Sequence, residues 1–356
     1  MTLHIFNPEH DLAMAANLKN FTASHSVRAF RTDMGFLPAL WAGDDDMVMV
    51  EDAKRAYATL KKIRARLAAS GCKAGGNVEF VMPGEIAGMK VEKIDVWGWD
   101  SAIVNSILQN DIICDTLPDM GHLEMIRKLS HRQTATGLLK KFAGDIFVGE
   151  SFFCGNVDMV AELLYRYGRI VIKAPWSCSG RGIRFAEKCI GNHLAGWIKN
   201  MLKIQGGVMV EPYYRKIMDF GMEFYSDGHG KVDYVGMSLF NTKNGAYTGN
   251  VIATETYKLD IIGKYIPDEY ILNVKERICT YLGDVYNNKY AGPLGIDMMI
   301  VPQSDGRGYL LHPCVEINLR RTMGHVALAV DPEDDEIVRS MEIVNNNNYQ
   351  LKIKSL

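Results

Sequence analysis

The clearest chemical signal in the sequence is a lysine that closes an apolar stretch and precedes a run of small residues. Lys173 follows Val171 and Ile172, and residues 177–182 read Ser-Cys-Ser-Gly-Arg-Gly. Small residues let backbone N–H groups approach phosphate oxygens closely, and a lysine adds a positive charge. The lysine precedes the glycines, so this is not a Walker G-x-x-x-x-G-K-[ST] loop. The pattern indicates either a phosphate-binding loop or a plain connection between two hairpin strands.

A second group of polar residues lies near the C-terminus. Asp297 sits in one apolar strand, and Glu316, Asn318 and Arg320 alternate with apolar residues in another. Because side chains alternate along a strand, Glu316, Asn318 and Arg320 share one face. Carboxylate and amide oxygens suit Mg²⁺, which often takes one or two carboxylates together with substrate phosphates. The alternative is a solvated polar face, but the flanking apolar residues favour a buried strand, where an unpaired glutamate is costly.

A third signal is a strand that ends on Glu211-Pro212, with Tyr213 directly after it and Glu223 in the next strand. Proline cannot donate a hydrogen bond to a sheet, so backbone groups near this break are left unpaired. Such groups can bind the edge of an adenine ring. The alternative is an edge strand followed by a solvated turn.

The elements that hold these residues are of two kinds. In the first third of the chain, apolar runs at residues 3–6, 47–50, 78–82 and 94–97 predict strands, and residues 53–67 have the apolar spacing of an amphipathic helix. Strands that alternate with helices predict a parallel sheet.

From about residue 120 the pattern changes. Helices are predicted near residues 133–142, 158–167, 193–202 and 269–285, with a final helix from about Thr322. Strands are predicted at residues 169–174, 207–214, 294–301 and 309–318. Residues 221–226 and 232–239 predict a hairpin across a glycine-containing turn, and the four asparagines at 345–348 predict another turn.

Composition and charge argue against several classes of protein. The 42 acidic and 40 basic side chains leave a formal charge of -2, so no basic field attracts nucleic acid or an anionic membrane. No segment approaches the roughly 18 apolar residues that a membrane span needs. The seven cysteines are scattered and form no C-x-x-C pair, which is typical of reduced thiols, so we expect a cytoplasmic protein.

Taken in this order, the three signals resemble the ATP-grasp superfamily over roughly residues 120–330. The resemblance implies an α/β fold with an α+β lid. A Rossmann-like pre-ATP-grasp domain on the substrate side, residues 1–120, would precede a two-lobed ATP-grasp fold. Its lid subdomain would span residues 121–215, and a C-terminal subdomain with the metal site residues 216–356. The implied cofactors are ATP and Mg²⁺ or Mn²⁺.

The resemblance also implies a role for each motif. Lys173 is similar to the lysine that touches the ATP phosphates, and Arg320 to the arginine that faces the transferred phosphoryl group; both are candidate catalytic residues. The lid loop over the phosphates corresponds to Ser177, Ser179, Gly180 and Gly182, and the adenine hinge to Glu211 and Tyr213. Glu223 corresponds to the carboxylate that binds the ribose. The metal ligands correspond to Asp297, Glu316 and Asn318.

The sequence departs from the family pattern at two places. The family usually has an earlier lysine in a Ser-Asp-Lys-like context, where this chain reads Ser130-His131-Arg132. Arginine also binds phosphate well, so Arg132 is the candidate for that contact. The first metal ligand, Asp297, is an aspartate where glutamate is commoner, and its reach is shorter.

Polar residues follow the first predicted strand directly, among them Asn7, His10 and Asp11. Ligands of open α/β sheets bind beyond the carboxyl ends of the strands, so these are candidate substrate contacts. An equally good alternative is a helix cap. Residues 97–100, Trp-Gly-Trp-Asp, end another strand in the same way. The two loops can therefore meet over one pocket, although a tryptophan pair is more often packing than recognition.

The expected activity is that of an ATP-dependent carboxylate–amine ligase. A small acid is phosphorylated to an acylphosphate, which an amine then attacks. The expected partners are these two small molecules, with no nucleic acid and no membrane, and an oligomer is left open. The alternatives are a small-molecule kinase with the same ATP site and a non-catalytic ATP-binding protein, against which the apparently complete metal set argues.

Overall fold

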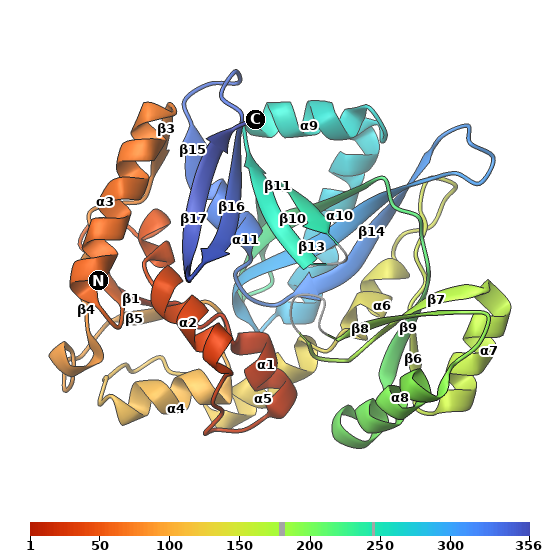
Figure 1. Ribbon diagram of the computed structural model, residues 1–356, viewed down its shortest axis with the longest axis horizontal. Coiled ribbons are helices and arrows are strands. Elements are labelled where there is room, and N and C mark those ends of the chain that lie inside the picture. The colour runs from red at the N-terminus through yellow and green to blue at the C-terminus, as the bar shows by residue number, and fades with distance from the viewer. Residues whose placement is uncertain (178–181, 244–245) are drawn as a thin grey trace.

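The computed structural model describes residues 1–177, 182–243 and 246–356. The predicted lid-loop residues Ser179 and Gly180 lie outside the described residues. Figure 1 shows three groups of elements: an N-terminal part in red and orange, a smaller lobe in green, and a large sheet in cyan and blue between them.

The N-terminal part is built on a parallel sheet with the strand order β4-β2-β1-β5. The predicted parallel sheet is confirmed, and each predicted strand lies within two residues of β1 (Thr2–Ile5), β2 (Met47–Met49), β4 (Glu79–Val81) and β5 (Lys93–Val96). The helices here are α1 (His10–Ala16), α2 (His25–Met34), α3 (Ala53–Ala69), α4 (Ser101–Gln109) and the short η1 (Leu37–Leu40) and η2 (Pro83–Glu85). The loops after β1 and β5 leave the same edge of the sheet, because the two strands are parallel neighbours.

Helices α5 (Met120–Leu129) and α6 (Thr134–Leu139) lead into a second, antiparallel sheet with the order β6-β9-β7-β8. Its strands are β6 (Phe152–Cys154), β7 (Arg169–Lys173), β8 (Ile183–Glu187) and β9 (Val208–Pro212). Together with α7 (Val157–Tyr167) and α8 (Asn192–Gln205), they bury an apolar core of their own. We call this unit the lid lobe.

The rest of the chain forms a seven-stranded sheet, the central sheet, with the order β14-β13-β10-β11-β12-β16-β17 and antiparallel pairing throughout. Its first five strands are β10 (Met218–Asp227), β11 (Val232–Lys243), β12 (Ala246–Ile252), β13 (Ala291–Pro302) and β14 (Tyr309–Asn318). The predicted hairpin is confirmed as β10 and β11. One face of the sheet packs Phe220, Met222 and Ile296 with α10 (Asp268–Tyr286), and α9 (Glu255–Gly263) lies beside it.

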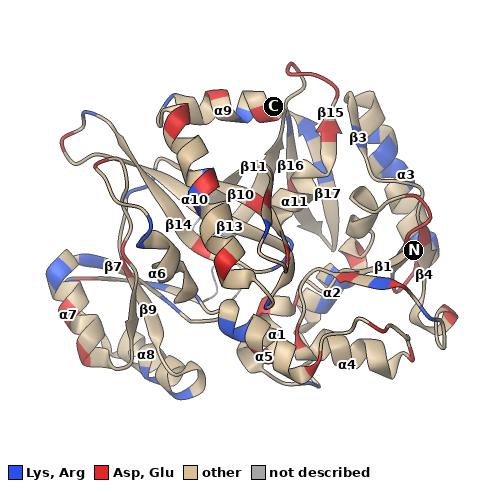
Figure 2. Cartoon of the chain, turned by 180° about the vertical axis from the view of Figure 1, so that it is seen from behind, with Lys and Arg blue, Asp and Glu red and all other residues tan. Residues whose placement is uncertain are grey.

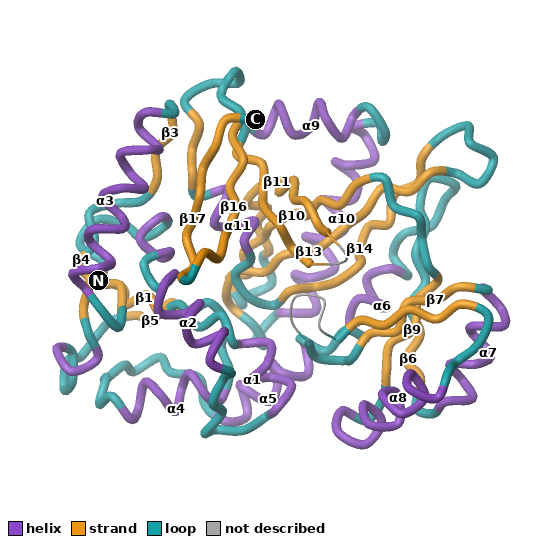
Figure 3. The backbone as a smooth tube through the Cα atoms, viewed as in Figure 1, coloured by secondary structure: helices purple, strands orange, loops and turns teal. Residues whose placement is uncertain are grey.

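The C-terminal segment contains strands that were not predicted. The helix predicted from about Thr322 is confirmed as α11 (Met323–Leu328), but the chain then continues as β15 (Val330–Pro332), β16 (Arg339–Asn346) and β17 (Asn348–Ser355). Strand β15 pairs with β3 (Cys72–Ala74), and the apolar residues of β16 and β17 join the core of the N-terminal part. Figure 3 shows these strands beside α3. The predicted asparagine turn is confirmed, with Asn347 at a φ of 67° between β16 and β17.

Among the described residues, charged side chains and cysteines are spread over the molecule. Figure 2 shows acidic and basic residues interspersed over the N-terminal part, the lid lobe and the central sheet. The six cysteines that the structure describes are all free thiols. Within the described part of the chain, no helix is both long enough and apolar enough to cross a membrane.

Candidate active site

The predicted metal ligands lie on one face of the central sheet, opposite the face that packs on α10. In the pairing of β10, β13 and β14, Asp297 lies directly opposite Glu316, and Gly295 lies directly opposite Glu223 on one side and Asn318 on the other. Directly opposed residues of antiparallel strands share a face. Strand pairing therefore gathers Asp297, Glu316, Asn318 and Glu223 on a single polar surface.

Asp297 is the most electrostatically perturbed member of this group. Burial raises its pKa, the charges of Glu316 and Glu223 raise it further, and the result is about 7 despite the hydrogen bond from Asn318. Crowded carboxylates of this kind are relieved by a cation. Among the described residues, no three His, Cys, Asp or Glu side chains are arranged to hold a metal by themselves. Two carboxylates and an amide fit Mg²⁺, which takes its other ligands from phosphates and water.

Arg132, between α5 and α6, connects this polar face to the loop after β7. Its Nη2 lies 2.6 Å from Oε1 of Glu316, and its Nη1 donates to the Ala174 carbonyl at 2.7 Å and to Oγ of Ser177 at 2.8 Å. The side chain is buried. The structure therefore brings Arg132, Ser177 and Glu316 together, and their roles in binding phosphate and metal stay predictions. Gly182 closes the same loop, since a Cβ there would lie 2.2 Å from Oγ of Ser177.

Lys173 points from the end of β7 toward the central sheet. Its Nζ lies 2.6 Å from Oε2 of Glu211 and donates to the carbonyl of Val315 at 3.3 Å. Lys173 and Glu211 are both buried, and they come from the neighbouring strands β7 and β9. The lysine thus bonds the residue next to the predicted metal ligand Glu316. Its phosphate contact stays a prediction, because Glu211 is its partner here.

Tyr213, a predicted adenine contact, makes its contacts with other residues of the lid lobe. Its backbone N–H donates to the carbonyl of Arg169 at 3.0 Å, and the Arg169 guanidinium lies 3.7 Å from the centre of its ring. The ring also contacts Phe185. The backbone donor of Tyr213 is therefore occupied, and the part of this residue in adenine binding stays a prediction.

Glu223 shares the polar face but is closed off by its neighbours. Its Oε2 lies 3.0 Å from Nδ1 of His325, and both side chains are buried. A Cβ at Gly324 would lie 1.8 Å from Oε1 of Glu223, so the carboxylate needs a glycine at that position. A ribose contact by Glu223 would require the pair with His325 to open, and it also stays a prediction.

Arg320 connects the central sheet to the N-terminal part. Its Nε and Nη2 donate to the two carboxylate oxygens of Asp11 at 2.9 and 2.8 Å, and Nη2 also reaches Oδ1 of Asn318 at 3.1 Å. Burial alone raises the pKa of Asp11, but the charge and hydrogen bonds of Arg320 outweigh it and lower that pKa. Asp11 is therefore a carboxylate fixed in a bidentate ion pair beside a proposed metal ligand.

The loops after β1 and β5 meet, as predicted. Asn7 donates to the carbonyl of Gly98 at 2.8 Å, and Nδ1 of His10 lies 2.9 Å from Oδ2 of Asp100. Asn7 is buried within this junction, whereas His10 and Asp11 reach the pocket described next. The alternative helix cap is not seen at α1, since its N-cap residue Glu9 makes no side-chain cap hydrogen bond; Asp100 instead caps α4 by accepting from its first N–H groups.

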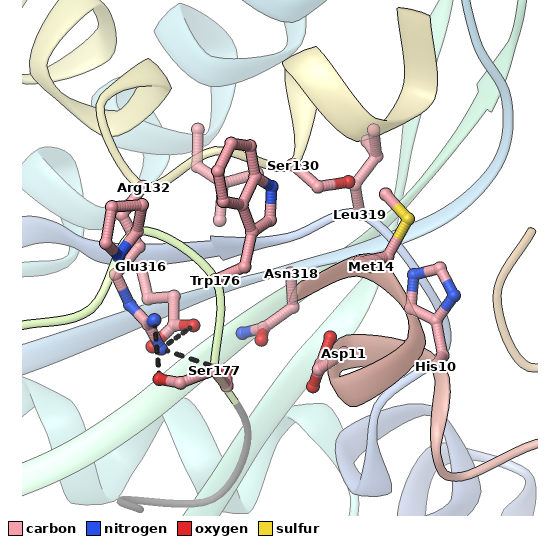
Figure 4. Close-up of a pocket in the computed structure, with 12 residues that line it drawn as sticks. His10, Asp11, Met14, Ser130, Arg132, Trp176, Ser177, Glu316, Asn318 and Leu319 are labelled. Carbon is pink, nitrogen blue, oxygen red and sulfur yellow. Dashed lines mark hydrogen bonds and ion pairs between the residues drawn. The ribbon is translucent and has the colours of Figure 1, made fainter. Parts of the chain in front are cut away.

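A pocket lies where the central sheet, the lid lobe and α1 meet. Figure 4 shows Arg132, Glu316 and Ser177 on one side of it, Asp11 and His10 on the other, and Asn318 between them. The pocket has about 330 Å³ of empty space, part of which is open to solvent, and is lined by His10, Asp11, Met14, Ser130, Arg132, Pro175, Trp176, Ser177, Glu316, Ile317, Asn318 and Leu319. Lys173, Arg320 and Asp297 do not line it, but each lies next to or bonds a residue that does.

Sequence reasoning missed several residues of this pocket. Met14 lies four residues after His10 on α1, so helical spacing was the signal that could have found it. Trp176 directly precedes the predicted phosphate loop, and the guanidinium of Arg127 lies 3.8 Å from the centre of its ring. No local pattern marks Asp100 as the partner of His10, because that contact joins two separate loops.

The chain was also compared with known proteins. No protein-family model and no curated protein matches it. N5-carboxyaminoimidazole synthetase from Staphylococcus aureus, also solved with ADP, is a similar solved structure, 11% identical, with a TM-score of 0.48 over 96% of this chain and 82% of its own.

Two further solved structures resemble the chain. A putative ATP-grasp superfamily protein from Archaeoglobus fulgidus is 12% identical, with a TM-score of 0.43 over 100% of this chain and 99% of its own. D-alanyl-alanine synthetase A from Vibrio cholerae is 14% identical, with a TM-score of 0.42 over 82% of this chain and 92% of its own. We take no substrate from these likenesses.

Proposed function

We propose that this chain, which has an ATP-grasp fold, is an ATP-dependent ligase that activates a small carboxylate as an acylphosphate and passes it to an amine. The observation that carries the proposal is the composition of the pocket. Glu316 and Asn318 line it from the central sheet, Arg132 and Ser177 from the side of the lid lobe, and Asp11 from α1. One cavity thus joins proposed metal ligands, a proposed phosphate contact and the proposed substrate loop.

The proposed site offsets the charge of a nucleotide. Asp297, Glu316 and Asn318 would hold Mg²⁺, which supplies positive charge to the phosphates. An attacking carboxylate needs further positive charge beside the phosphates, since two like unit charges ~4 Å apart repel by about 4 kcal/mol even at an effective dielectric near 20. Lys173 and Arg320 add the further cations. Phosphoryl transfer by such a site depends on positioning and electrostatic stabilisation, with no side-chain nucleophile.

Arg132 has a second part in the proposal. It now bonds both Glu316 and Ser177. A bound nucleotide would offer the guanidinium a phosphate oxygen in place of Glu316, which would leave the carboxylate available to hold Mg²⁺. Arginine suits this exchange because its planar group accepts carboxylate and phosphate with the same geometry.

Two other functions compete with the ligase. A small-molecule kinase would use the same ATP site and stop after phosphorylating its acceptor. A non-catalytic ATP-binding protein would have no need for Asp297, Glu316 and Glu223 to be crowded together, an arrangement that raises the pKa of Asp297 to about 7. We place the protein in the cytoplasm, with the acid and the amine as its partners; the free cysteines support this.

The test is ADP release from Mg-ATP in a screen of small acids and amines. A ligase should release ADP slowly with ATP alone and much faster when acid and amine are both present. A kinase would need the acceptor alone, and a binding protein would release no ADP. Glu316→Ala should lose Mg²⁺-dependent nucleotide binding with little loss of fold, whereas Glu162→Ala on the exposed side of α7 is the matched control. Equal ATP affinity with and without Mg²⁺ would count against the metal assignment.

A further inference from the structure

His10 lines the pocket, but the phosphoryl chemistry proposed above gives it no task. Its Nδ1 lies 2.9 Å from Oδ2 of Asp100, and both side chains are only 2% exposed. The other oxygen of Asp100 accepts hydrogen bonds from the N–H groups of Ala102 and Ile103 at 2.8 and 2.9 Å. The carboxylate is therefore fixed at the start of α4, and it fixes the imidazole in turn.

The orientation of the ring is determined by its surroundings. A Cβ at Gly98 would lie 2.6 Å from ring atoms of His10, so the backbone of Gly98 packs directly against the imidazole. The side chain of Asn7 holds Gly98 in place, because it donates to the Gly98 carbonyl and accepts from the Gly98 N–H. With Asp100 accepting from Nδ1–H, the neutral tautomer carries its lone pair on Nε2. Among the residues that the structure describes, none forms a hydrogen bond with Nε2.

The other ionisable groups that line the pocket are already paired. Asp11 is bound by both arms of Arg320, and Glu316 is bound by Arg132. Within the described lining of the pocket, His10 is therefore the base whose lone pair is not held by a cation or a donor. An Asp–His pair with a free Nε2 is the arrangement by which a carboxylate orients an imidazole to accept a proton.

We propose that His10 is the general base that accepts a proton from the attacking amine, and that Asp100 is its positioning residue. The inference rests on the proposed ligase function. The ammonium group gives one proton to Nε2, and the freed lone pair forms the C–N bond to the acyl carbon. The C–O bond to the phosphoryl group then breaks, and its electron pair leaves with the phosphate, which takes the second proton from nitrogen.

Hydroxylamine separates this step from the formation of the acylphosphate. It is mostly unprotonated at neutral pH, so it attacks an acylphosphate without a base and gives a hydroxamate. A panel of small acids with Mg-ATP and hydroxylamine first identifies the acid that the wild-type protein activates. The same acid with ammonium or primary amines then reports the step that needs a base. The variants are His10→Gln, Asp100→Asn and, as a matched control on the exposed surface of α5, His122→Gln.

We expect His10→Gln to slow amine-dependent ADP release by about 100-fold or more, the usual size of a general-base contribution, and hydroxamate formation much less. The amine reaction should recover as pH rises and more of the amine loses its own proton. The charged groups Asp11, Arg132 and Glu316 line the same pocket, and Arg320 bonds Asp11, so the pH profile is compared between variants. Asp100→Asn should change the ratio of the two rates in the same direction, because an amide donates to Nδ1 and moves the proton to Nε2.

Three outcomes overturn the proposal. An unchanged ratio of the two rates in His10→Gln means that another group accepts the proton. Equal losses of both reactions, with Mg-ATP binding and thermal stability kept, mean that His10 holds the acid. If the wild-type protein gives no hydroxamate with any acid, the ligase function itself fails, and the base role fails with it; this outcome is recognised in the wild-type protein before any variant is tested.

Discussion

Arg320 and Arg321 are neighbours in the chain, and each forms an ion pair with a carboxylate. The two ion pairs lie in different regions of the molecule. Arg320 bonds Asp11 and Asn318 at the edge of the pocket. Arg321 bonds Asp95 on β5 at 2.9 Å and lies 4.7 Å from the centre of the Trp41 ring. Both are arginine–carboxylate pairs between the central sheet and the N-terminal part.

The two regions differ in how many fixed partners each carboxylate has. Oδ2 of Asp95 contacts Nδ1 of His4 at 2.8 Å and Nε1 of Trp41 at 3.2 Å besides Arg321, and His4 in turn reaches Asp46. None of these residues lines the described pocket. Asp11 bonds the guanidinium of Arg320 and lines the pocket. We infer that the Asp95 cluster fastens the fold, while the pairs around the pocket are contacts that ligands can exchange.

The largest expected effect is on stability, in the Asp95 cluster. Asp95→Asn leaves Arg321 and His4 without their common counter-charge, and breaking such a largely buried pair lowers the free energy of unfolding by up to about 3–5 kcal/mol. Chemical denaturation measures it, with Asp11→Asn as the matched change at the pocket, where we expect a loss nearer 1 kcal/mol. Equal losses for the two variants would remove the distinction between the regions.

The next effect is on nucleotide affinity, in the lid lobe. Lys173→Ala removes the proposed charged phosphate contact, worth roughly 1.5–3 kcal/mol, which corresponds to a loss of about 10- to 150-fold in affinity for Mg-ATP. Calorimetry measures it, and Lys231→Ala, an exposed lysine between β10 and β11, is the control. A nucleotide complex in which Lys173 points away from the phosphates would show that the motif assignment is wrong in this half of the molecule.

A third effect appears in acid. Burial raises the pKa of Asp95, but the hydrogen bond from His4 and the charge of Arg321 lower it to about 2. A carboxylate with a depressed pKa stabilises the fold above its unfolded pKa near 4, and this contribution is lost as pH falls from about 4 toward 2. The contribution is roughly 2 kcal/mol. Unfolding measured between pH 6 and pH 2 should therefore show a steeper acid loss in the wild type than in Asp95→Asn, and parallel curves would contradict this.

The sequence predicted the parts of the site that depend on local pattern. Alternation along one strand placed Glu316 and Asn318 on a common face, and the pairing of β13 with β14 adds Asp297 to it. The helix predicted from about Thr322 is confirmed as α11, with Thr322 as its N-cap. The strands that follow it were not predicted, because they are held by contacts with the distant N-terminal part, such as that between Tyr349 and Phe30.

Contacts between distant segments could not be predicted from one sequence. Asp11 and Arg320 lie 309 residues apart, and His10 and Asp100 lie 90 apart. The sequence marked each of these residues, either as a candidate site residue or as a polar residue of a loop. The local sequence pattern, however, does not indicate which carboxylate pairs with which cation. For the same reason, the sequence did not show that Lys173 pairs with Glu211 or that Arg132 pairs with Glu316. These two ion pairs would have to open before either cation could bind a phosphate.

The smallest expected effect, and the sharpest test of exchange at the pocket, is that of Asp11→Asn on the affinity for Mg-ATP. An amide keeps the size of the side chain but withdraws the charge that holds Arg320. If the pair is exchangeable, Arg320 becomes free for a phosphate, so we expect calorimetry to show an unchanged affinity or a gain of up to about fivefold, below roughly 1 kcal/mol. The dependence of ADP release on acid and amine should fall, because Asp11 belongs to the proposed substrate loop. Asn7→Ala is the companion change in the buried junction, and it should alter this dependence without any gain in affinity, since Asn7 bonds no cation among the described residues. If Asp11→Asn abolishes ATP binding instead, the loop after β1 belongs to the nucleotide site, and the pair of Asp11 with Arg320 is a fixed fastening like that of Asp95 with Arg321.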